Sequence, residues 1–306
     1  MHKLLILSEQ EKQYRSLIEK AHLPDLIIES TLTPEVDIVF GAPSLIKDAL
    51  ASLPALSWVQ TTSAGVETLT NLAIRRDYTL RVTNARDVFG RLMSEYVFGY
   101  LLAHERKIFQ LAQAQKNKQW DDSLTGTLRG KTIGLLGVGS IGAEIARTAK
   151  FFDMTVRGYT RESEISTNVD KYFHRKDILE FAGGLDYLVS VLPNTKETRK
   201  IVDAKLFTVL PPHAILINVG RGPAVDESAL IEALNQNKIA GAVLDVFEQE
   251  PLPKEHPFWT TPNLLMTFHT SAPSLPEDIT KIFIENYKLF VEGKPLNYQV
   301  DFEKGY

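Results

Sequence analysis

The sequence contains no cysteine among its 306 residues, which excludes disulfides, thiolate nucleophiles and cysteine metal ligands. Hydrophobic residues make up 44% of the chain, but they come in short runs. None approaches the roughly 20 apolar residues that a membrane-spanning helix needs. The first ten residues, MHKLLILSEQ, hold only a brief apolar stretch, unlike the long apolar core of a signal peptide. We therefore expect a cytoplasmic protein that has no membrane span.

An excess of charge of one sign is also missing. The chain has 34 basic and 38 acidic residues, for a net charge of -4, and no long run of either sign. A protein that binds the phosphate backbone of nucleic acids usually carries a concentrated basic surface. We therefore expect no nucleic-acid partner and look for a small-molecule ligand.

The pattern of apolar residues predicts two α/β regions. Up to about residue 83, four short strands (KLLIL, DIVF, SWVQTT and TLRVT) alternate with helical patterns. One long helix is predicted over residues 94–119, and six further strands separated by helices follow from Lys131. The fold class is thus two Rossmann-like or flavodoxin-like α/β domains with parallel sheets and a cleft between them. We place the domains at residues 1–98, at 99–272 and, in a return to the first domain, at 273–306.

A glycine-rich turn opens the second series. The segment GLLGVGSIG carries Gly137, Gly139 and Gly142 between a predicted strand and a predicted helix that begins at Ser140 and Ile141. Such glycines allow a tight turn, a close approach of the backbone to a pyrophosphate, and close packing of helix on strand. The amides at the helix start favour a bound phosphate. Glycines in such a turn can also serve geometry alone, but the flanking strand and helix favour a dinucleotide.

The end of the next strand bears on the choice of coenzyme. In NAD enzymes a carboxylate follows this strand and binds the ribose hydroxyls, whereas this chain has Thr160 and Arg161 there. An arginine favours a 2'-phosphate through charge-assisted hydrogen bonds, which predicts NADPH over NADH. The alternative is that Arg161 is a solvated loop charge.

Polar residues follow three of the later strands, at the edge where parallel sheets bind ligands. Arg221 lies between two glycines and is suited to a carboxylate; the alternative is a salt bridge between domains. Glu248 and Glu250 follow the next strand, and one of them could orient a base. His269 ends the last strand, and with a carboxylate partner it becomes a candidate proton donor, although a lone histidine is more often structural.

Several motifs together resemble the D-isomer-specific 2-hydroxyacid dehydrogenase family over nearly the whole chain. They are TTSAGVETL (61–69), GLLGVGSIG (134–142), VLPNTKETRKIVD (191–203), NVGRGPAVDESAL (218–230), LDVFEQEPLP (244–253) and FHTSAPS (268–274). The resemblance implies that Arg221 binds and polarises a keto acid, that Glu250 and not Glu248 pairs with the histidine, and that His269 is the acid/base. One departure is Phe268, which stands where the family usually has proline.

The resemblance also assigns binding residues. The amides of Ala64 and Gly65 would hold the substrate carboxylate, unless they form an ordinary turn, and Asp245 would contact the nicotinamide, unless it only stabilises its loop. The remaining coenzyme contacts fall in the motifs after two strands: Leu192, Pro193, Val219 and Gly220. The predicted reaction is hydride transfer from NADPH to a small 2-keto acid of the glyoxylate or hydroxypyruvate type, which gives a D-2-hydroxy acid and needs no metal.

Two rival functions share this fold. One is a nucleotide-sensing binding protein similar to corepressors, which the acidic composition disfavours but the residues do not exclude. The other is a phosphoglycerate dehydrogenase, which the absence of a C-terminal regulatory domain disfavours. We also expect a homodimer formed through the long helix and the segment near Trp120, with Leu101, Leu102, Ile108 and Leu111 at the interface; the alternative is that these residues pack on their own domain.

Overall fold

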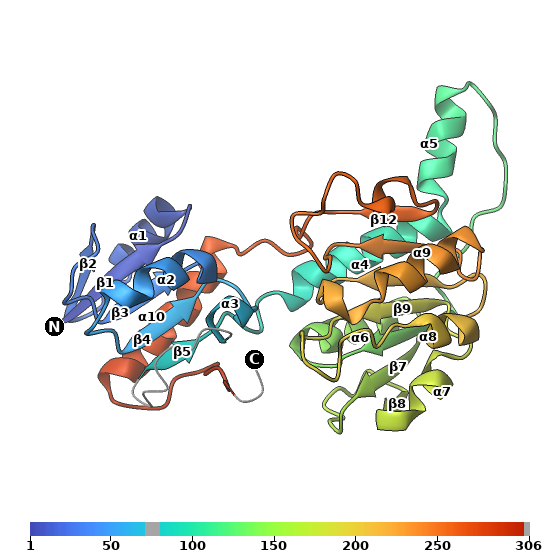
Figure 1. Ribbon diagram of the computed structural model, residues 1–306. Coiled ribbons are helices and arrows are strands. Elements are labelled where there is room, and N and C mark those ends of the chain that lie inside the picture. Colours follow the sequence, from blue (N-terminus) through green and yellow to red (C-terminus); the bar gives the residue numbers. More distant parts are fainter. Residues whose placement is uncertain (71–79, 303–306) are drawn as a thin grey trace. The chain divides into compact units, whose positions relative to one another are not determined.

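The computed structural model describes residues 1–70 and 80–302 and divides into two compact units. Unit 1 comprises Met1–Val88 with Ser274–Tyr306, and unit 2 comprises Phe89–Pro273. Each unit is built on one parallel sheet with helices against it (Figure 1).

Unit 1 has a five-stranded sheet in the order β2-β1-β3-β4-β5, with every neighbouring pair parallel. This is the flavodoxin-like order, in which the chain passes from one side of the first strand to the other. The strands are β1 His2–Leu7, β2 Leu26–Glu29, β3 Ile38–Gly41, β4 Trp58–Thr61 and β5 Arg81–Thr83. The helices are α1 Glu11–Lys20, α2 Pro43–Ala49, α3 Glu67–Thr70 and α10 Pro276–Val291.

The C-terminal helix α10 belongs to the core of unit 1. Its Phe283 stacks on the fully buried Trp58 of β4 with ring centroids 5.2 Å apart, and it also meets Phe40 of β3. Aromatic pairs of this kind contribute packing beyond the area that they bury. Pro276 at the helix start and Gly293 just beyond its end match the expected start and stop signals.

Unit 2 has a seven-stranded parallel sheet in the order β12-β11-β10-β9-β6-β7-β8. The strands are β6 Thr132–Leu136, β7 Thr155–Thr160, β8 Lys171–His174, β9 Tyr187–Ser190, β10 Ile215–Asn218, β11 Gly241–Leu244 and β12 Leu264–Met266. The helices are α4 Gly90–Glu105, α5 Ile108–Lys116, α6 Ser140–Phe151, α7 Ile178–Ala182, α8 Ala204–Val209 and α9 Glu227–Asn235.

Both faces of this sheet are buried, which explains the continuous apolar runs in its strands. Successive residues alternate between two clusters: Leu135 packs in the cluster with Ile145 of α6, and Leu136 packs in the cluster with Leu206 of α8. The parallel order therefore brings all the carboxyl ends of these strands to one edge, as the predicted fold class requires.

The structure corrects the predicted helix over residues 94–119. The chain breaks into α4 and α5, and Lys107 between them has a φ of 51°, in the left-handed region that ends α-helices. The predicted boundary after residue 98 falls inside α4, whereas the compact unit begins at Phe89, because α4 packs along α6. The strand prediction also missed β2 and β8, each a four-residue strand at the edge of its sheet.

Candidate active site

The structure brings two of the three predicted catalytic side chains into direct contact. The Nδ1 atom of His269 lies 2.8 Å from Oε2 of Glu250, and the other carboxylate oxygen of Glu250 accepts a hydrogen bond of 2.9 Å from the amide of Phe247. His269 follows β12 and Glu250 follows β11, and these strands are neighbours in the sheet. Because one ring nitrogen is held by Glu250, the Nε2 atom is left for a ligand.

The charges of this pair support each other. The hydrogen bond to Glu250 raises the pKa of His269 above its ordinary value, although burial and nearby Arg221 oppose this. Burial alone would raise the pKa of Glu250, but hydrogen bonds from His269 and Phe247, together with the charges of His269 and Arg221, hold it below its usual range. The histidine is therefore favoured as an imidazolium that can donate a proton, as a general acid must.

Asp245 anchors the segment that carries His269. Its side chain is fully buried at the end of β11, where it accepts hydrogen bonds from the Thr267 hydroxyl (2.5 Å) and the amides of Thr270 (2.8 Å) and Ser271 (3.0 Å). Burial would raise the pKa of Asp245, but these bonds hold it below its ordinary value. Asp245 thus performs the loop-stabilising role, while its contact with nicotinamide stays a prediction.

Two supporting residues were not identified from the sequence. They are Thr267 and Tyr96, whose hydroxyl oxygens lie 2.6 Å apart. Because the Thr267 hydroxyl donates its proton to Asp245, the hydroxyl of Tyr96 on α4 donates to Thr267. His269 itself has a φ of 56°, a left-handed backbone that is uncommon for a residue other than glycine, asparagine or aspartate. The hydrogen-bonded chain from the part-buried Tyr96 and Thr267 to the buried Asp245 holds this turn. In the sequence, only the partly apolar helix pattern around Tyr96 indicated that it faces inward.

Arg221 follows β10, and both glycines beside it are required by the packing. A Cβ atom on Gly220 would lie 2.7 Å from the backbone of Leu192, and one on Gly222 would lie 1.9 Å from the carbonyl carbon of Phe247. The Arg221 segment is thereby packed between the segments that follow β9 and β11. Its charge acts on both His269 and Glu250, which places the guanidinium near this pair.

An apolar hollow of about 570 Å³ adjoins the acid/base pair. Glu250 and His269 line it together with the apolar residues Phe247, Pro251, Leu252, Trp259 and Phe268. The Trp259 and Phe268 rings lie 5.8 Å apart, and the Trp259 indole donates a hydrogen bond to the carbonyl of Pro253. The aromatic residue before the histidine therefore forms a wall with Trp259. Phe268, which stands where the family usually has proline, thus contributes an aromatic side chain to this hollow.

The glycine loop has the tight backbone geometry that was predicted for a phosphate-binding turn. Gly137 has a φ of 97°, and a Cβ on Gly142 would lie 2.2 Å from the Gly137 carbonyl oxygen, so both positions need glycine. Gly139 is the residue before α6, and nothing stands within 4 Å of where its Cβ would be. The start of α6 is thus open to a ligand, which fits the pyrophosphate of a dinucleotide.

The end of β7 differs from its predicted use in one respect. The Thr160 hydroxyl donates to the carbonyl of Ser163 at 2.7 Å, and the residue is only 7% exposed, so it closes the turn within the protein. The Arg161 side chain is 61% exposed and lies 3.8 Å from Glu197. The expected preference for a 2'-phosphate therefore depends on Arg161 more than on Thr160.

Ala64 and Gly65 lie in unit 1, in the turn between β4 and α3. The Asn84 amide donates to the carbonyl of Ala64 at 2.8 Å, and the Ser63 hydroxyl donates to that of Gly65 at 2.9 Å. These bonds fix the turn through its carbonyl oxygens. The role of the two amides toward a substrate stays a prediction.

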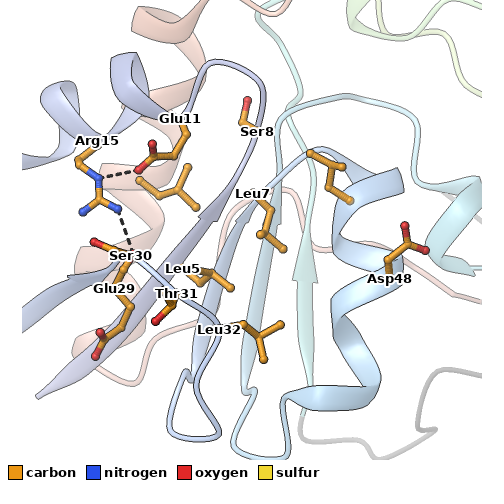
Figure 2. A pocket seen from close by; sticks show the side chains of 12 residues that line it. Leu5, Leu7, Ser8, Glu11, Arg15, Glu29, Ser30, Thr31, Leu32 and Asp48 are labelled. Atoms are coloured by element: carbon orange, nitrogen blue, oxygen red, sulfur yellow. Dashed lines mark hydrogen bonds and ion pairs between the residues drawn. The ribbon is translucent and has the colours of Figure 1, made fainter.

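Unit 1 has a hollow of its own, of about 630 Å³, which Figure 2 shows over β1 beside α2. Its arginine is already engaged: Arg15 donates to Glu11 at 2.6 Å and to the carbonyls of Ile28 and Glu29. It holds no histidine and no pair of groups set for proton transfer. We therefore place the chemistry beside His269.

Neither a metal cluster nor a membrane-spanning helix occurs within residues 1–70 and 80–302. Within these ranges, no group of three or more histidine, aspartate or glutamate side chains is placed to hold a metal ion. The helices in the same ranges are each too short or too polar to cross a bilayer.

Comparisons with known proteins agree with this geometry. Residues 98–271 match the family of the D-isomer specific 2-hydroxyacid dehydrogenase, NAD binding domain. A glyoxylate/hydroxypyruvate reductase A of Klebsiella pneumoniae is 32% identical over 217 residues, which cover 71% of this chain and 70% of the relative.

Two solved structures share the fold over almost the full length. A D-isomer specific 2-hydroxyacid dehydrogenase family protein of Aeromonas salmonicida has 42% identity and a TM-score of 0.94, covering 98% of this chain and 99% of that one. A D-isomer specific 2-hydroxyacid dehydrogenase of Xanthobacter autotrophicus, in complex with NADPH and MES, has 31% identity and a TM-score of 0.89, covering 100% of this chain and 99% of that one.

Proposed function

We propose that this chain, which belongs to the D-isomer specific 2-hydroxyacid dehydrogenase family, reduces small 2-keto acids of the glyoxylate and hydroxypyruvate type with NADPH. Membership makes it an NAD(P)-dependent oxidoreductase of 2-hydroxyacids; the keto acid, the direction and the phosphorylated coenzyme are the proposal. The observation that carries it is the 2.8 Å contact between His269 and Glu250, at the sheet edge that also bears Arg221 and the glycine loop.

The residues divide the chemistry between them. NADPH, when bound, supplies the hydride that reaches the carbonyl carbon. His269 donates the proton from Nε2 to the carbonyl oxygen, and Glu250 keeps the ring oriented and cationic until it does so. Arg221 binds the carboxylate and draws charge toward the developing alkoxide, which stabilises the transition state. Ala64 and Gly65 are the predicted further partners of the carboxylate.

The coenzyme contacts follow from the open start of α6. Gly137, Gly139 and Gly142, with Ser140 and Ile141, would surround the pyrophosphate. The backbone after β9 and β10 would flank the nicotinamide side, through Leu192, Pro193, Val219 and Gly220. The Xanthobacter relative was crystallised with NADPH, which supports the phosphorylated coenzyme.

A substrate panel tests the proposal. We expect turnover of glyoxylate and hydroxypyruvate with NADPH, measured as the loss of absorbance of the reduced nicotinamide. Turnover of bulky branched keto acids should be slower. Tight coenzyme binding without turnover of any keto acid would instead indicate a nucleotide-sensing protein. A preference for a phosphorylated hydroxypyruvate would indicate the phosphoglycerate dehydrogenase alternative.

We further propose that the chain forms a homodimer through α5 and the segment that follows it. Ile108 is 50% exposed, and Trp120 and Leu124 are 94% and 90% exposed, an unusual amount of apolar surface to leave in water. Figure 1 shows α5 standing out from the rest of unit 2. Leu101, which we had placed at the interface, is instead fully buried within its own unit. Sedimentation showing a monomer at micromolar concentration would contradict the dimer.

A further inference from the structure

Three cationic side chains gather where β7 and β8 end, and each already has a carboxylate partner. The two strands are parallel neighbours, and their register pairs Thr160 with His174, so the residues that follow lie at the same sheet edge as the glycine loop. The pairs are Arg161 with Glu197 at 3.8 Å, His174 with Glu164 at 3.0 Å, and Arg175 with Glu162.

His174 is placed to be an imidazolium. Its Nδ1 atom lies 3.2 Å from both the carbonyl and hydroxyl oxygens of Thr160, and its Nε2 atom lies 3.0 Å from Glu164. A neutral ring can donate from only one nitrogen, so oxygens at both nitrogens favour the doubly protonated form. The bond to Glu164 raises the pKa of His174, with the Thr160 carbonyl and the charge of Asp177 adding to it and desolvation opposing it.

These ion pairs can be broken with little loss of stability, so another anion can replace the glutamates. The Glu164 side chain is 58% exposed and that of Glu162 is 66% exposed, and ion pairs that open to water contribute little to stability. A phosphomonoester carries almost two negative charges and three strong acceptor oxygens, so it competes well for an imidazolium or guanidinium. The glutamates therefore act as stand-in anions that a phosphate can displace.

We propose that His174 is a coenzyme-specificity residue, which binds the 2'-phosphate of NADPH together with Arg161 and which Glu164 opposes by competing for the same imidazole ring. The inference rests on the proposed function, because it concerns the adenosine end of the same coenzyme. It adds a contact from β8 that the residues after β7 did not predict. On this view, the preference for NADPH depends on how well the 2'-phosphate competes with the neighbouring glutamates for the same cationic side chains.

Titration with coenzyme fragments tests this without turnover. Adenosine 2',5'-bisphosphate and adenosine 5'-monophosphate differ by the 2'-phosphate alone, so the ratio of their Kd values, measured by calorimetry at about pH 6.5, reports this contact. His174→Gln should reduce the preference for the bisphosphate roughly fivefold, and Glu164→Gln should increase it roughly threefold, as single charges at short range through water do. The Kd of the monophosphate should not change in either variant.

Lys171→Gln is the matched control, because it removes one exposed cation at the opposite end of β8, where Lys171 pairs with Glu180. This control should leave both Kd values unchanged. If His174→Gln binds the bisphosphate as tightly as the wild type while Arg161→Ala does not, His174 is a surface residue and the inference is wrong, although NADPH use stands. If neither fragment nor coenzyme binds the folded wild type, the proposed function fails as well.

Discussion

The segments after β11 and β12, at one end of the strand order, and those after β7 and β8, at the other end, are held by different interactions. After β11 and β12, the fully buried Asp245 accepts hydrogen bonds from Thr267, Thr270 and Ser271, and this fixes the segment that carries His269. After β7 and β8, by contrast, the charged side chains form exposed ion pairs, such as Arg161 with Glu197. Both ends lie at the carboxyl edge of one seven-stranded sheet.

The difference matches what each end would have to do. A proton donor must stay within hydrogen-bond reach of one atom, so its backbone benefits from a buried network that has a single arrangement. A phosphate site must give up its resident carboxylates when the ligand arrives, so weak exposed pairs suit it. Substitutions at the first end should therefore be severe, and those at the second should be mild and specific to one coenzyme.

The largest effect is expected at the proton donor. His269→Gln should lower kcat for glyoxylate reduction by roughly a hundredfold or more, because the general acid is lost while the loop keeps its anchor. Stopped-flow and steady-state assays of the reduced coenzyme would measure it. The Kd of NADPH should stay within about twofold of the wild type, since the glycine loop is untouched. Full turnover in this variant would place the proton donor elsewhere.

The next effect is on stability and contrasts the two ends directly. Asp245→Ala should lower the free energy of unfolding by about 3 kcal/mol, because it leaves the buried amide of Ser271 and the part-buried donors of Thr267 and Thr270 without their partner. Glu162→Gln, at the exposed end, should change it by less than about 0.5 kcal/mol. Urea denaturation, followed by circular dichroism, measures both. Equal losses in the two variants would remove the distinction between a fixed and an exchangeable end.

A smaller effect is expected in the pH profile. Reduction needs the protonated form of His269, and the bond to Glu250 raises its pKa, so activity should fall as pH rises through that raised value. Glu250→Gln removes the counter-charge and lowers the pKa of His269, so kcat/KM should begin to fall at a lower pH. The maximal rate should also drop roughly tenfold, because the ring is less well oriented.

Glu248→Gln is the control for that profile. Glu248 lies two residues from Glu250 but pairs with Arg199 at 3.4 Å, so its loss should leave the alkaline limb where it was. An identical shift in both variants would mean that the net charge of the loop, and not the contact with His269, sets the pKa.

The smallest effect concerns the coenzyme. Arg161→Ala should raise KM for NADPH roughly fivefold and leave NADH kinetics almost unchanged, because the guanidinium is well exposed and its field is screened. The difference between coenzymes should shrink as salt is added. Arg129→Ala removes a charge before β6 that is even more exposed than Arg161 and should change neither KM value. NADH used as well as NADPH by the wild type would make Arg161 a solvated loop residue.

Local patterns in the sequence were enough to predict the elements that one short segment determines by itself. The strand, turn and helix around Gly137 and Gly142 were predicted correctly, because the glycines and the apolar run lie within a dozen residues. The choice of Glu250 over Glu248 as the partner of His269 came from the family resemblance and not from a local pattern, and the structure has that contact at 2.8 Å.

Features that depend on distant partners were missed. The bond from Tyr96 to Thr267 joins residues 171 positions apart, so no local pattern marks it. For Asp245 the sequence left open a contact with nicotinamide or a role in stabilising its loop, and it gave no sign of the bond from Thr267. The edge strands β2 and β8 were overlooked because they have one neighbour each, and half-buried edges have weak apolar patterns. The break at Lys107 has no proline or glycine beside it to mark it, and the one glycine of the predicted helix, Gly99, lies inside α4.

The close packing around Arg221 matters for anyone who wishes to exchange loops among related enzymes. With Gly220 against the backbone of Leu192 and Gly222 against that of Phe247, the three segments after β9, β10 and β11 touch main chain to main chain. A loop grafted at one of these points would need the other two to match it in length and backbone shape. Protein engineers should therefore transplant the three segments as one cassette, and a chimera that swaps the Arg221 segment alone should misplace Glu250.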